Sequence, residues 1–111
     1  MKITSEKHGA VLVVMPAGRL DATNSDEMTD ALLTAFDAGD ELIVVDLSGL
    51  EYISSAGLRA LLVGAKRASE EGGKIVLSRP EDYIEEVFDA AGFSAIFTIF
   101  ASTDEAVSDL Q

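Results

Sequence analysis

Two adjacent serines, Ser54 and Ser55, are the residues of this chain whose type and spacing are best suited to chemistry. An apolar run ends near Asp46 and helical spacing of apolar residues resumes at Leu58, so a helix is predicted to begin at Ser55. The Ser55 hydroxyl could then cap the free amides of the first helical turn, a contact worth about 1 kcal/mol. It could also accept a phosphate, because those amides and the helix dipole favour anions.

The neighbours of Ser55 favour the second interpretation. Ala56 and Gly57 are small, so the first turn is expected to present bare backbone that a large partner surface can approach. Arg59 stands at the i+4 spacing that would place it on the same helical face, although a plain surface arginine is an equally good explanation. Phosphorylation would add about −1.5 to −2 charges where a helix tolerates them, so the fold is expected to survive it.

Common catalytic and cofactor motifs are missing from the sequence. It has neither a Gly-x-Gly-x-x-Gly segment nor a Walker phosphate loop, and Ile53 stands where a Gly-x-Ser-x-Gly elbow needs its first glycine. The single histidine, His8, lies in a polar N-terminal segment, there are no cysteines, and the carboxylates lack the spacing of a metal loop. We therefore expect a binding protein that is not an enzyme, with no metal and no cofactor.

The charge balance narrows the range of partners. Eight basic residues against twenty acidic ones give a formal net charge of −12, which repels nucleic acid and anionic membranes. The acidity is explained either by the solubility of a monomer or by a basic protein partner. No apolar run approaches the roughly 18 residues that span a bilayer, and the N-terminal segment lacks the pattern of a secretory signal. A cytoplasmic protein is the expectation.

Periodicity along the chain alternates between strand and helix. Short, largely β-branched apolar runs typical of strands buried on both faces occupy residues 11–15, 42–45, 74–77 and 96–100. Helical spacing appears at 28–36, 58–65, 84–91 and 103–110. Glycines at 39, 72 and 92 are placed to end three of these helices, Ser102 and Glu105 have capping-box spacing, and residues 1–8 could add an edge strand. The pattern predicts one α/β domain over residues 1–111, with a mostly parallel central sheet of four to five strands and about four helices.

The segment 46–62 resembles the signature of the STAS domain family, specifically its anti-sigma factor antagonists. In that family a strand and loop deliver Asp-Ser-Ser/Thr-Gly-Leu to the start of a helix, and the first serine of this pattern accepts a phosphate. Matched position by position, Ser55 falls on the acceptor, Gly57 on the glycine and Leu58 on the leucine.

The match has two departures and one supporting segment. Ser54 stands at the usual acidic position, and Ala56 replaces the second hydroxyl residue, which leaves Ser55 as the predicted acceptor. The segment 18–22 resembles the Gly-x-Leu-Asp turn that lies beside the acceptor in the family. Asp21 is therefore expected either to line the same surface or to cap the following helix.

The resemblance implies a partner switch. The unphosphorylated protein would bind an anti-sigma factor that is also a serine kinase, which frees a sigma factor; phosphorylation of Ser55 would block binding, and a serine phosphatase would restore it. The implied partner-binding residues are Asp21, Ser54, Ala56, Gly57, Leu58 and Arg59. Two alternatives remain: an accessory subunit of a transporter or other regulatory complex that is never phosphorylated, and a nucleotide-binding protein with weak hydrolysis.

Overall fold

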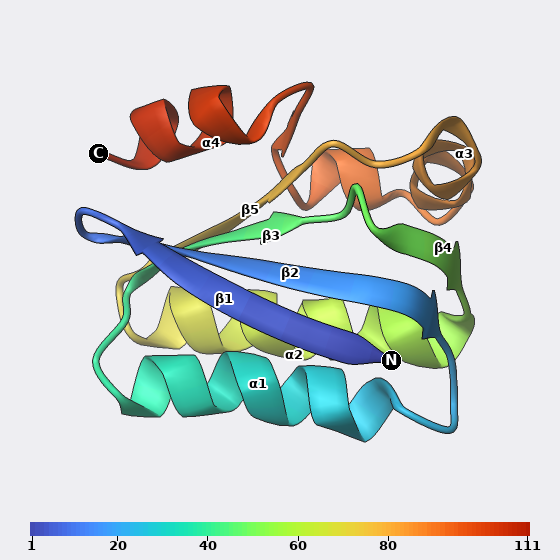
Figure 1. Ribbon diagram of the computed structural model, residues 1–111, viewed down its shortest axis with the longest axis horizontal. Helices are drawn as coiled ribbons and strands as arrows, with labels where there is room; N and C mark the ends of the chain where they lie inside the picture. The colour runs from blue at the N-terminus through green and yellow to red at the C-terminus, as the bar shows by residue number, and fades with distance from the viewer.

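The computed structural model describes residues 1–111 as a central sheet with helices on both faces (Figure 1). The elements follow one another in the order β1 (Lys2–His8), β2 (Val11–Leu20), α1 (Ser25–Asp37), β3 (Leu42–Asp46), β4 (Leu50–Ile53), α2 (Ser55–Glu70), β5 (Lys74–Ser78), α3 (Asp82–Ala90), the 3₁₀ turn η1 (Phe93–Ala95), β6 (Ile99–Phe100) and α4 (Thr103–Leu110). Helices α1 and α2 pack side by side on one face of the sheet, and α4 lies on the opposite face against β3, β5 and β6. No helix is both long enough and apolar enough to span a lipid bilayer.

The sheet has the order β1-β2-β3-β5-β6, and β4 is hydrogen-bonded to β2 off this path. Only β1 is antiparallel to its neighbour, and all other strand pairs are parallel. The predicted α/β class with a mostly parallel sheet and four helices is confirmed. The sheet has six strands, one more than the upper limit that we predicted.

Strand β4 is the one that the sequence did not show. No strand is predicted between the apolar run at 42–45 and the helix that begins at Ser55, but residues 50–53 pair with the segment Gly18–Leu20 at the far end of β2. The two ends of β4 are buried, whereas Glu51 is exposed and Tyr52 is half-buried, so the strand is too short and too polar to give a clear pattern. Strand β2 is long enough to pair with β3 along its first half and with β4 along its second half.

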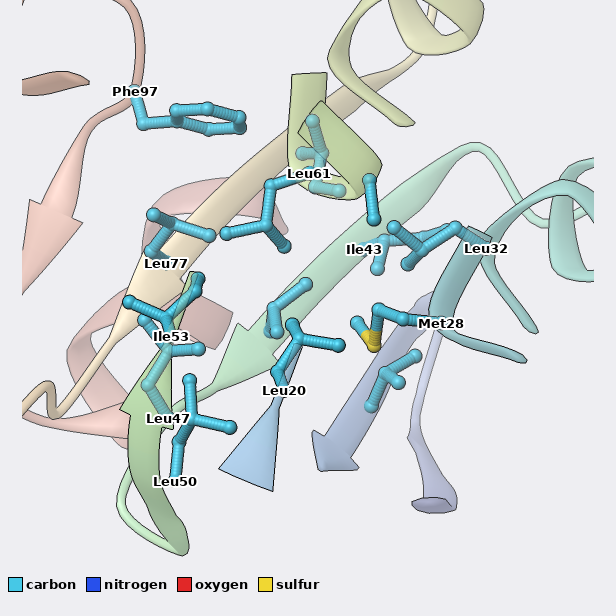
Figure 2. Close-up of a cluster of buried hydrophobic side chains, with 14 of the residues drawn as sticks. Leu20, Met28, Leu32, Ile43, Leu47, Leu50, Ile53, Leu61, Leu77 and Phe97 are labelled. Carbon is cyan, nitrogen blue, oxygen red and sulfur yellow. The ribbon is translucent and has the colours of Figure 1, made fainter. Parts of the chain in front are cut away.

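Two hydrophobic clusters lie on opposite faces of the sheet. The larger contains 20 buried residues, among them residues of α1, α2 and α3, and Figure 2 shows Leu20, Leu32, Leu61 and Leu77 among its labelled side chains. The smaller contains seven, and joins valines of β2, β3 and β5 to α4. Apolar side chains are therefore needed on both faces of the central strands, which explains their nearly unbroken apolar runs.

The predicted helix ends are confirmed. Gly39, Gly72 and Gly92 follow α1, α2 and α3 with φ of 101°, 71° and 78°, the left-handed conformation in which glycine avoids the clash of a side chain. The predicted cap of α4 is also present, because the Ser102 hydroxyl accepts a hydrogen bond from the Glu105 amide at 3.1 Å.

The strand predicted over residues 96–100 is wrong for its first half. Only Ile99–Phe100 forms strand β6, and residues 96–98 are a turn and irregular backbone that follow the 3₁₀ turn η1. The rings of Phe93 and Phe88 stack at 5.5 Å between centroids, and Phe97 lies 5.4 Å from Phe93. This aromatic packing draws Phe97 into the core and holds the backbone in a turn.

Candidate functional site

The start of α2 lies where two strands end. Strand β4 finishes at Ile53, the Ser54 amide donates a hydrogen bond to the Leu20 carbonyl of β2 at 2.9 Å, and α2 begins at Ser55. This is the carboxyl edge of the parallel strands, the edge at which α/β proteins place their binding sites.

Ser54, and not Ser55, caps α2. The Ser54 hydroxyl accepts a hydrogen bond from the Gly57 amide at 3.3 Å, and the Ser54 backbone is extended, with φ −96° and ψ 175°. The prediction that Ser55 is the N-cap is therefore wrong, although the predicted start of the helix is confirmed. The physical reason is that the cap is the residue before the first helical one, and Ser55 is itself the first helical residue.

The Ser55 side chain is exposed and makes no hydrogen bond that stabilises the fold. Its hydroxyl has no hydrogen-bond partner in the protein, since the capping bond belongs to Ser54. The first turn of α2 contains no acidic residue, whereas the first turns of α1, α3 and α4 each contain two. The first turn of α2 therefore contributes no carboxylate of its own to neutralise the positive end of the helix dipole.

Gly57 lies on the buried side of the helix. A methyl group at this position would stand 2.8 Å from Ile53 Cγ1, 2.8 Å from Leu20 Cγ and 3.0 Å from the Leu20 carbonyl oxygen. The expectation that Gly57 leaves bare backbone on the partner surface is wrong. The glycine instead lets α2 sit directly on the ends of β2 and β4.

The remaining residues of the first turn differ in exposure. Arg59 is exposed and forms no ion pair, so its guanidinium is available one turn beyond Ser55. Ala56 is half-buried, and Leu58 is half-buried with its side chain packed against the larger core cluster.

Asp21 follows the last residue of β2, and Leu20 before it holds the backbone of Ser54. Its carboxylate accepts hydrogen bonds from the Thr23 amide at 3.0 Å and from the Thr23 hydroxyl at 2.6 Å. These donors hold the pKa of Asp21 below its usual value. The carboxylate does not cap α1, whose N-cap position is taken by Asn24.

A cation–π pair beside the site was missed by sequence reasoning. Arg19 and Tyr52 are cross-strand neighbours of β2 and β4, and the guanidinium carbon lies 4.1 Å from the ring centroid. Only the pairing of these two strands brings the residues together. The pair could have been predicted from the sequence only if β4 had been recognised as a strand.

Comparison with known proteins gives consistent matches over almost the whole chain. The family model described as the STAS domain matches residues 2–106. The chain is 34% identical over 108 residues to BtrV of Bordetella bronchiseptica, a protein described as an anti-sigma factor antagonist, covering 97% of this chain and 93% of BtrV.

Solved structures show the same fold. An anti-sigma factor antagonist of Thermotoga maritima superposes with a TM-score of 0.92 at 23% identity, covering 97% of this chain and 93% of that chain. The Bacillus cell fate determinant SpoIIAA in its phosphorylated form superposes with a TM-score of 0.77 at 20% identity, covering 99% of this chain and 100% of that chain. At this level of identity, the two structures establish the architecture alone.

Proposed function

This chain belongs to the STAS domain family, and we propose that it is an anti-sigma factor antagonist whose binding is controlled by phosphorylation of Ser55. In its unphosphorylated form it binds an anti-sigma factor that is also a serine kinase, and so frees a sigma factor. The kinase phosphorylates Ser55 and ends the interaction, and a serine phosphatase restores it. The observation that carries the proposal is an exposed serine hydroxyl with no structural role at the start of α2.

The start of α2 is suited to carry a phosphate. The first-turn amides and the helix dipole attract anions, and no carboxylate in that turn competes. Arg59 is exposed, free of ion pairs and one turn away, so it can form a charge-assisted contact with the phosphate. The modified chain therefore keeps its fold.

The same phosphate is costly inside an interface. A doubly charged group buried against a partner without paired cations loses hydration worth several kcal/mol, and each 1.4 kcal/mol is tenfold in affinity. The change is felt at the contact surface because Ser55 contributes nothing to the packing of the domain.

We place the contact surface around Ser55 at the ends of two elements. Ser54, Ala56 and Arg59 come from the start of α2 and its cap, and Asp21 directly follows the last residue of β2. Leu58 contributes only the part of its side chain that is not packed against the core. Gly57 supports this surface from behind.

The net charge of the chain indicates which kinds of partner it can bind. A net charge of −12 suits an exchangeable, basic protein partner and opposes binding to nucleic acid or anionic lipid. We further propose that the chain is a cytoplasmic monomer without catalytic activity of its own, and that it is a substrate of the kinase and of the phosphatase.

The test is a matched set of variants assayed against the anti-sigma factor kinase of the same organism. Ser55→Asp should weaken calorimetric binding by at least about tenfold, with an unchanged melting temperature. Ser108→Asp is the control, because Ser108 is also an exposed helical serine but lies in α4. Ser55→Ala should keep binding and lose phosphorylation by kinase and ATP.

Two outcomes contradict the proposal. Phosphopeptide mapping that places the label on Ser48 or Ser54 makes the site assignment wrong. A chain that gains no phosphate from ATP and host lysate is not a phosphorylation switch, and the accessory-subunit alternative is then favoured.

A further inference from the structure

Strand β1 has no helix packed over it. None of its seven residues is buried, whereas four of the five residues of β3 and of β5 are. Helices α1 and α2 cover the sheet from β2 to β5, and α1 is the outermost helix of this layer on the side of β1 (Figure 1). Neighbouring strands lie about 4.8 Å apart and packed helices about 8–10 Å apart, so a sheet has room for one helix per two strands. On the face of the sheet that carries α1 and α2, there is therefore room for one more helix over β1, beside α1.

A groove of about 680 Å³ occupies this position. Its apolar lining consists of Ile3, Leu12, Val14, Ala31, Ala35 and Ala38. The apolar residues that α1 and its C-cap contribute are all alanines, so a partner helix can come close to the α1 backbone between the polar side chains. A partner helix can pack here with its axis near that of α1, in the manner of helix-in-groove recognition.

The charges along the groove determine what kind of helix fits. Asp40 lies at one end and is already paired with Lys7 at 2.5 Å. Glu27 and Asp30 also line the groove, both are exposed, and neither forms an ion pair or a side-chain hydrogen bond. In a chain of net charge −12, the groove offers an apolar floor with free carboxylates on the α1 side.

We propose that this groove, formed by β1, β2 and α1, is a second docking surface that binds a basic amphipathic helix of a partner protein. The apolar face of that helix packs on the alanines and on the β2 side chains, and its lysines or arginines meet Glu27 and Asp30. The surface does not include Ser55 or any residue of α2, so binding here is independent of the phosphorylation that we propose above.

The probe is a helical peptide with leucine and alanine on one face and lysine on the other, added to the full chain labelled for NMR. The same peptide with glutamate in place of lysine is the probe control. The lysine peptide should bind saturably and shift amide signals of β1, β2 and α1, and the glutamate peptide should not. Signals of the α2 first turn should stay unchanged.

Variants separate the groove from general acidity. The double variant Glu27→Gln with Asp30→Asn should weaken lysine-peptide binding about threefold to tenfold. The double variant Asp82→Asn with Glu86→Gln removes the same charge from α3 and should change nothing. Thr34→Trp should block the groove sterically, and because Thr34 is exposed, the variant should melt at the wild-type temperature.

The proposal is overturned by any of three results. The lysine peptide fails to bind, or its shifts map outside the groove, or the α1 and α3 double variants weaken binding equally. Because the assay uses neither the kinase nor ATP, failure here leaves the Ser55 switch untouched, and failure of the switch leaves this docking surface untouched.

Discussion

Ser54 and Ser55 are neighbours in the chain, yet we expect their replacement by alanine to have opposite consequences. Ser54→Ala removes the hydroxyl that accepts the hydrogen bond of the Gly57 amide. Ser55→Ala removes a hydroxyl that has no partner in the protein and lies in solvent. The first variant should lose folding stability and the second should lose only its capacity for phosphorylation.

The magnitude follows from the geometry of the cap. Loss of a capping side chain costs about 0.5–2 kcal/mol, and the bond length of 3.3 Å in Ser54 puts this cap in the lower half of that range. A loss of about 1 kcal/mol corresponds to a fall in melting temperature of about 4 °C in a domain of 111 residues. An exposed substitution such as Ser55→Ala should stay within about 0.5 kcal/mol of wild type.

Urea unfolding followed by circular dichroism measures both variants, and Ser102→Ala is the positive control. The Ser102 hydroxyl caps α4 through the Glu105 amide at 3.1 Å, so its loss should cost at least as much as that of Ser54. If Ser55→Ala proves as destabilising as Ser54→Ala, the Ser55 hydroxyl has a structural role, and the assignment of the two serines is refuted.

Three further predictions concern the same region. Gly57→Ala should destabilise the chain by about 1–3 kcal/mol in urea unfolding, because the new methyl group meets Leu20 Cγ at 2.8 Å and the overpacking outweighs the gain in helix propensity; a more stable variant would show that β2 and α2 separate freely. The pKa of Asp21 is lowered by its hydrogen-bond donors, so its ionised form adds stability that is present above the unfolded pKa and is lost as pH falls through the folded one. Urea midpoints taken between about pH 5 and pH 2.5 should therefore fall less steeply for Asp21→Asn than for wild type, and parallel curves would contradict this. In the phosphorylated protein, Arg59→Ala should raise the phosphate pKa measured by phosphorus NMR, because a nearby cation favours the dianion; an unchanged titration would place Arg59 away from the phosphate of Ser55.

Much of the fold was predictable because local patterns and tertiary packing agree. The apolar runs at 42–45 and 74–77 need burial on both faces, and the structure supplies helices on both faces. The glycines that end α1, α2 and α3 were recognisable because a left-handed residue is needed at each position. The single α4 cap was readable from the spacing of Ser102 and Glu105 alone.

The parts that could not be predicted depend on distant partners. Strand β4 is only four residues long and is extended because β2 reaches past β3 to pair with it. The turn before β6 forms because Phe97 packs with Phe93, and an apolar run alone does not distinguish this packing from a strand. In the candidate site, the start of α2 was predicted correctly. Which of the two serines caps the helix depends on a difference of one residue in position, which the pattern of apolar residues does not resolve.

The contact between Gly57 and the end of β2 also limits how this protein can be retargeted. Because Gly57 packs against the side chains of Ile53 and Leu20 and the Leu20 carbonyl oxygen with no space for even a methyl group, the first turn of α2 has a fixed seat on the ends of β2 and β4. If Ser55 is the phosphate acceptor that we propose, adaptation to a different kinase cannot come from tilting this helix. On that proposal, specificity would change through the exposed side chains around Ser55, so the design of orthogonal pairs should vary those side chains and keep the contact between α2 and the end of β2.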